Sequence, residues 1–133
     1  MSIIAKQFLV NALEDGSAYA LARVLTKNSS HNLIAAVQSD ISTISRSVFL
    51  YTDNVVGTTA IIGPTALVVA DAVLNALSTG DVWTLDTTGF NFLDTVPVTA
   101  FPTGGATYDL RYTFTSDSGL TFFLVFKVVT VAN

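Results

Sequence analysis

Histidine, serine and carboxylate side chains are the groups in this chain that could carry out acid–base or nucleophilic chemistry. A general acid–base site requires two or three ionisable groups held together with shifted pKa values. His31 is the only histidine, and it lies in the polar run 28–32, which is typical of a solvated turn. Serine and aspartate are present, but no Gly-x-Ser-x-Gly segment accompanies them. We therefore expect no catalytic residues and no enzymatic activity.

Three aspartates raise the question of a calcium site, because carboxylate oxygens are ligands that Ca²⁺ prefers. Asp81, Asp86 and Asp94 do not follow the spacing of an EF-hand loop, and aspartate is common in turns. The chain contains no cysteine, so the sequence excludes thiolate zinc sites, disulfides and thiol nucleophiles. It also contains no glycine-rich phosphate-binding loop. The sequence predicts neither a metal nor a cofactor.

Aromatic side chains at strand spacing could form either a sugar-binding platform or part of a hydrophobic core. The residues concerned are Trp83, Phe90, Phe92, Phe101, Tyr108, Tyr112 and Phe114. We interpret them as core residues, because a platform requires several aromatic rings to be exposed on one surface. Exposure of Trp83, Tyr108 or Tyr112 would instead indicate a glycan-binding module.

Charge is scarce in this chain, while apolar residues are abundant. Half of the 133 residues are hydrophobic and 12% are charged, compared with about 25% in average soluble proteins. A surface rich in threonine and serine is polar without charge, but the low charge favours self-association or incorporation into a larger assembly. The net charge is −4 and the six basic residues are scattered, so we expect no nucleic-acid partner. The uncharged stretch 54–70 is interrupted by Gly63-Pro64 and is too short to span a membrane, so we expect no membrane partner.

Alternating and β-branched segments separated by polar turns predict a mainly β fold. Strands are expected over Tyr19–Lys27, Ile41–Thr52, Tyr108–Thr115 and Leu120–Val131. One short linking helix is expected near 70–77, where apolar residues recur at helical spacing. Residues 1–17 are either an N-terminal arm or a first strand, ahead of a domain over 18–133. The predicted fold class is an antiparallel, immunoglobulin-like β-sandwich with an N-terminal arm.

The last expected strand, Leu120–Val131, has no polar face. Successive side chains of a strand point to opposite faces, and here the face with Phe126 and the face with Phe123 are both mostly apolar. An antiparallel strand with one solvated face would be polar on one of them. Either the strand is central between two layers of its own domain, or one of its faces is covered by another chain.

The segment Val82–Phe92 reads Val-Trp-Thr-Leu-Asp-Thr-Thr-Gly-Phe-Asn-Phe. It resembles a Trp-x-x-Asp-Ser/Thr-x-Gly-Tyr/Phe-Asn-Phe segment of small phage and phage-derived structural proteins. Val73–Leu77, Thr95–Pro97, Phe101-Pro102, Tyr108–Tyr112 and Phe123–Phe126 resemble other parts of the same module. The match spans roughly residues 40–132, and it departs from the family at Phe90, where tyrosine is frequent. The resemblance implies a virion structural protein, either a capsid decoration protein or a tail-associated protein.

The residues of this segment have a structural interpretation that does not depend on the resemblance. Trp83 is large enough to fill a core, and Gly89 permits a tight bend. Asp86 and Asn91 can fix the loop through hydrogen bonds from side chain to backbone. We therefore interpret these four residues as determinants of the fold.

These observations together predict a non-enzymatic phage structural protein, most specifically a cement or decoration protein on the capsid surface of the virion. Its partners are predicted to be itself, as a dimer or trimer, and a major capsid protein. The predicted interface residues are Ile3, Ile4, Phe8 and Leu9, which would clasp a neighbour, and Phe123, Val125, Val129 and Val131, which would bind a partner subunit. Two alternatives remain open: a tail or fibre module that recognises a host glycan or surface protein, and a monomeric sandwich with a central last strand.

Overall fold

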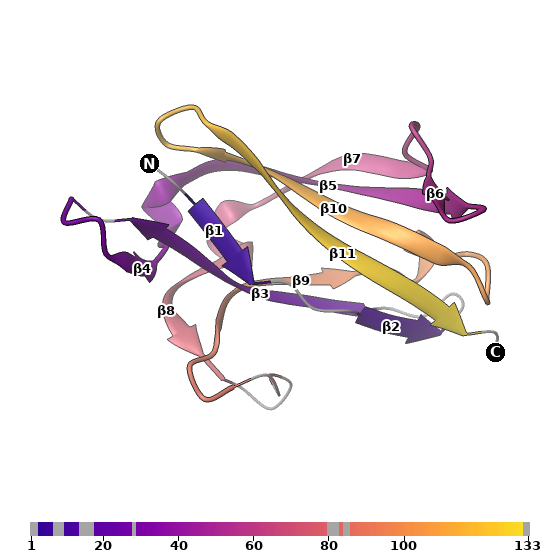
Figure 1. Cartoon of the computed structure of the whole chain (residues 1–133), viewed down its shortest axis with the longest axis horizontal. Helices are drawn as coiled ribbons and strands as arrows, with labels where there is room; N and C mark the ends of the chain where they lie inside the picture. Colours follow the sequence, from indigo (N-terminus) through magenta and orange to yellow (C-terminus); the bar gives the residue numbers. More distant parts are fainter. Residues whose placement is uncertain are drawn as a thin grey trace.

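Two β-sheets form the fold, and Figure 1 shows them as two layers. The computed structural model describes residues 3–6, 10–13, 18–27, 29–79, 83 and 86–131, with the backbone alone at 3–6, 10–13, 18, 98 and 131. The first sheet has the order β1 (Ile3–Lys6), β3 (Ala18–Lys27), β9 (Phe90–Val96) and β8 (Val73–Ser78), with β4 (Leu33–Ala35) pairing to β3. The second has the order β2 (Val10–Leu13), β11 (Thr121–Val131), β10 (Thr107–Ser116), β5 (Ile41–Thr52) and β6 (Val55–Val56), with β7 (Ile62–Leu67) pairing to β5. The mainly β, sandwich-like fold is therefore confirmed.

The four long strands lie where the sequence predicts them, to within one residue at either end. Their alternation decides which side chains enter the space between the sheets. Tyr108, Leu110, Tyr112 and Phe114 of β10 are buried, while Thr113 between them is half-buried. From the first sheet, Phe92 packs edge-on against Tyr112, with ring centroids 4.9 Å apart. The core is therefore an aromatic layer shared by both sheets.

The aromatic residues that could have formed a sugar-binding platform are all buried. Trp83 is 6% exposed, Tyr108 is 1% exposed and Tyr112 is fully buried. Phe90, Phe92, Phe101 and Phe114 are buried as well. Their interpretation as core residues is confirmed, and they present no aromatic surface to a glycan.

Trp83 fills a smaller cluster than the main core. It packs with Leu21 and Phe90, and its ring centroid lies 5.7 Å from that of Phe90. Leu21 alternates along β3 with Ala20 and Ala22, which belong to the main core, so this cluster lies on the other side of the first sheet. The Trp83 side chain therefore lies on the outer side of the first sheet.

Asp86 and Gly89 hold this loop as the sequence suggests. The Asp86 carboxylate accepts hydrogen bonds from the Trp83 indole N–H at 2.9 Å and from the backbone N–H of Thr88 and Gly89. It also forms an ion pair with Arg23 at 2.9 Å. The Arg23 guanidinium, followed by the Trp83 indole and the Gly89 backbone N–H, holds the pKa of Asp86 well below its usual range. Gly89 has φ of 99°, and any Cβ there would collide with the carbonyl of Ser78.

Asn91 takes the place of backbone pairing at the end of the β3–β9 ladder. The last paired residues are Ala22 and Phe92. Beyond them, Asn91 Oδ1 accepts from the Val24 N–H at 2.7 Å, and its Nδ2 donates to the carbonyls of Val24 and Ala36. Asn91 is 1% exposed, so these bonds satisfy backbone groups that water does not reach.

The linking helix is shorter than the sequence predicts. α1 covers Val69–Ala72 only, and the residues that follow form the edge strand β8. β8 pairs with β9 at both ends, through Val73 with Phe92 and Ser78 with Phe90. Eight residues are too few for a stable isolated helix, so pairing with the sheet outweighs the weak helical pattern. Two further one-turn elements are η1 (Gln38–Asp40) and η2 (Val98–Ala100).

The N-terminal segment contributes one strand to each sheet. β1 pairs antiparallel with β3, and β2 pairs in parallel with β11 (Figure 1). Both strands therefore lie at sheet edges of their own chain.

No helix in the described part of the chain has the length and apolar character needed to cross a bilayer.

Candidate functional site

The outer face of the second sheet presents the apolar side of β11. Leu124 and Phe126 point toward the first sheet and are fully buried, whereas Phe123 points the other way and is 56% exposed. Val125 and Val129 lie on the same side as Phe123 and are half-buried. Among the described residues, β11 is therefore covered on one face only, which does not fit the alternative of a central position between two layers.

Hydroxyl side chains surround this apolar row. In the strand register, Phe123 of β11 lies opposite Thr113 of β10, and Thr113 lies opposite Ser45 of β5. Val129 is paired with Thr107 in the same way. Directly opposed residues in an antiparallel pair lie side by side on one face. The part of the outer face around Phe123 thus has an apolar row along β11 beside hydroxyl groups of β10 and β5.

Two cations lie against aromatic rings on this face. The Arg111 guanidinium carbon is 4.8 Å from the centroid of the Phe49 ring, and Lys127 Nζ is 5.8 Å from that of Tyr51. Both distances are within the range of cation–π attraction. Arg111 also forms an ion pair with Asp109 at 3.2 Å. These contacts fix the positive charge of the face at defined points.

Asp109 is a buried carboxylate on the outer face of the second sheet. It is buried although its strand position points away from the core, and its side chain is 4% exposed. Its Oδ1 and the Nε of Arg111 have no hydrogen-bond partner in the part of the chain that the structure describes. Such groups carry a desolvation cost that a further hydrogen bond would offset.

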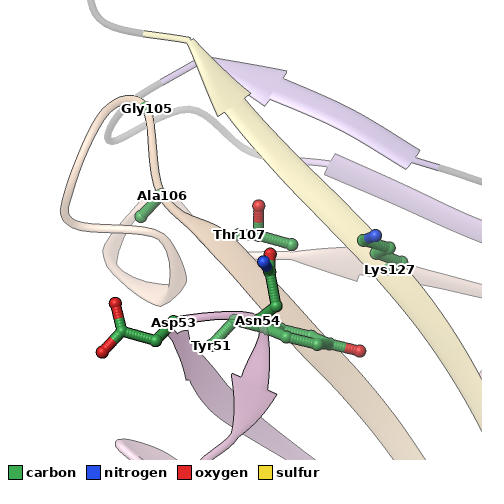
Figure 2. Close-up of a pocket in the computed structure, with 7 residues that line it drawn as sticks. All are labelled: Tyr51, Asp53, Asn54, Gly105, Ala106, Thr107 and Lys127. Carbon is green, nitrogen blue, oxygen red and sulfur yellow. The ribbon is translucent and has the colours of Figure 1, made fainter.

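A hollow of about 280 Å³ lies at one end of the outer face (Figure 2). Its lining residues are Tyr51, Asp53, Asn54, Gly105, Ala106, Thr107 and Lys127. The hairpin between β5 and β6 forms one wall, with positive φ at both Asp53 and Asn54, as a two-residue turn requires. The hollow therefore shares Tyr51 and Lys127 with the outer face.

A second hollow, of about 420 Å³, lies between the sheets beside β7 and α1 and includes Arg46, Asp71 and Asp94. Asp94 Oδ2 forms an ion pair with Arg46 at 2.7 Å and accepts a hydrogen bond from the Tyr112 hydroxyl at 2.7 Å. Burial, reinforced by the Asp94 carboxylate, raises the pKa of Tyr112 well above its usual value, so the hydroxyl remains a donor. These three groups satisfy one another and tie the two sheets together.

The aspartates considered for calcium are not brought together. Asp86 is paired with Arg23, and Asp94 is paired with Arg46. Asp81 lies outside the described residues. Within the described ranges, no group of three histidine or carboxylate side chains could hold a metal. His31 is exposed in the turn between β3 and β4.

The predicted interface residues that the structure describes lie on strands of both sheets. Phe123, Val125 and Val129 share the outer face; Val131 is on the same strand, with its side chain outside the described residues. Ile3 and Ile4 are in β1 of the other sheet, also with undescribed side chains, and Phe8 and Leu9 lie outside the described residues.

Sequence reasoning missed the aromatic and charged groups that surround the apolar row. Phe49 and Tyr51 alternate along β5 with Val48, which is buried, and Leu50, which packs partly buried against the core, so alternation alone could have placed them on the outer face. Their pairing with Arg111 and Lys127 depends on the register of three strands, which alternation alone does not fix. No protein-family model, curated protein or solved structure matches this chain.

Proposed function

We propose that this chain is a non-enzymatic structural protein of a phage virion that docks through the outer face of its second sheet, most specifically as a cement or decoration protein on the capsid. The observation that carries this proposal is the exposed apolar row along β11, with Phe123 56% exposed in a chain of only 12% charged residues. Exposed apolar surface of this kind is typical of protein–protein contacts. The assignment to a virion is supported by the resemblance of the Val82–Phe92 segment.

The energetics suit a protein that is repeated over a shell. Burying a large apolar side chain contributes about 1.5–3 kcal/mol, or about 25 cal/mol per Å² of apolar area. A contact made by Phe123, Val125 and Val129 therefore contributes several kcal/mol before the entropic cost of association. Each such contact is modest, but many equivalent contacts across a symmetric shell stabilise the particle together.

The location of the protein is tested by immunogold electron microscopy, with antibody against the purified chain and particles from induced cultures of the host that carries the gene. Label over the capsid surface is the expected result. Label confined to the tail or fibres would favour the host-binding alternative, and particles without label would refute a virion protein.

The docking face is tested by rebinding the purified protein to particles from which it has been removed. Phe123→Asp is expected to abolish rebinding, because a carboxylate in an apolar contact is desolvated without a partner. Leu33→Asp is the matched control, since Leu33 is 50% exposed on β4 of the other sheet. Rebinding of Phe123→Asp at the level of the control would show that another surface docks.

A further inference from the structure

The end of the outer face differs chemically from the apolar row beside it. We propose that the hollow between the β5–β6 hairpin and Lys127 receives a carboxylate side chain of the partner protein, and that this contact sets the register of docking. This inference rests on the proposed function, because it assumes that the outer face docks on another protein. It adds a charged recognition site next to the apolar row of β11.

Hydrogen-bond donors converge on the hollow. Lys127 Nζ is held by the Tyr51 ring, 5.8 Å from its centroid. Figure 2 shows the Asn54 side chain rising from the hairpin toward Thr107, with Lys127 on the neighbouring strand. An ammonium, an amide N–H and a hydroxyl are groups that bind a carboxylate through charge-assisted hydrogen bonds.

No described residue supplies a carboxylate to Lys127. Asp53 lines the hollow, but its carboxylate points away from Lys127 (Figure 2). Asp109 is opposite Lys127 in the ladder, but its ion pair is with Arg111, and it is buried. Among the described residues, no carboxylate lies within ion-pair distance of Lys127. The ammonium group of Lys127 therefore lies at the hollow without an ion pair to any described carboxylate.

Continuity with the apolar row favours a protein ligand over an acidic sugar. Lys127 lies on the same side of β11 as Val125 and Val129. A partner surface that covers these valines brings its own side chains to the hollow. An aspartate or glutamate at the rim of that surface would meet Lys127, and complementary charge at a rim fixes orientation and speeds association.

The test is an NMR titration of the isotope-labelled full chain with N-acetyl-glutamate N-methylamide. The matched probe is N-acetyl-glutamine N-methylamide, which has the same shape without the charge. We expect millimolar binding of the glutamate derivative, with amide shifts at Asn54, Thr107 and Lys127 and at least about fivefold weaker binding of the glutamine derivative. Lys127→Gln should reduce affinity by a similar factor, whereas Lys27→Gln, an exposed control on β3, should not.

Two results would overturn the inference. The first is a response of equal size to the charged and uncharged probes, or one that is not localised at the hollow. The second is tighter binding of glucuronate than of the glutamate derivative, which would assign the hollow to an acidic sugar. This experiment uses no virion particles, so its failure is distinct from a failure of the proposed function.

Discussion

Replacing Asn91 by alanine tests whether the Val82–Phe92 segment determines the fold. The substitution removes three hydrogen bonds, but the Val24 carbonyl keeps a second partner, the Ala36 N–H at 2.9 Å. Two buried backbone groups, the Val24 N–H and the Ala36 carbonyl, thus lose a partner. An orphaned buried group costs about 1–3 kcal/mol, so the free energy of unfolding should fall by about 2–6 kcal/mol. That is a large share of the roughly 5–15 kcal/mol by which domains are stable.

Urea unfolding measures this loss. With a slope of about 1–3 kcal/mol per M, the urea concentration at the unfolding midpoint should fall by at least about 0.7 M. Asn75→Ala is the matched control, because Asn75 accepts one exposed hydrogen bond from the Gln38 N–H, which water can replace. We expect the control to lose less than about 1 kcal/mol. A loss for Asn91→Ala within about 0.5 kcal/mol of that of the control would refute the reasoning.

Three further predictions concern the loop and the docking face. Gly89→Ala should lower the melting temperature more than Gly119→Ala does, because φ is positive at both positions but only at Gly89 would the new Cβ meet a backbone carbonyl, that of Ser78. Equal effects of the two substitutions would contradict the close approach of Ser78 to Gly89. The low pKa of Asp86 means that its stabilising contribution is present above about pH 4 and is lost as the pH falls below that value. Acid titration followed by circular dichroism should therefore show a smaller loss of stability in Asp86→Asn than in the unmodified chain. Parallel titration curves for the two proteins would argue against this contribution of Asp86. Phe123→Asp should remain folded, with a free energy of unfolding within about 0.5 kcal/mol of that of the unmodified chain. Light scattering should nevertheless find this variant to be monomeric. A stable, correctly associated oligomer of the variant would exclude this face from self-association.

The N-terminal segment and α1 show where sequence reasoning was incomplete. Short apolar runs carry little conformational preference of their own, so their state depends on the sheet edge that they meet. Residues 73–77 meet β9 and form an edge strand in place of a helix. β1 and β2 each meet a different sheet, a choice that no local pattern in 1–17 encodes.

The sequence by itself determined the long strands, the turn after β10 and the two apolar faces of β11, because side-chain alternation and turn residues act within a few positions of the chain. Only the tertiary structure decided that Phe123 faces outward, since both faces of β11 are apolar and either could have packed on the first sheet. It also decided which groups meet across strands. Arg111 reaches Phe49 and Lys127 reaches Tyr51 through registers set by distant strands, and a slip of one residue would place each on the opposite face.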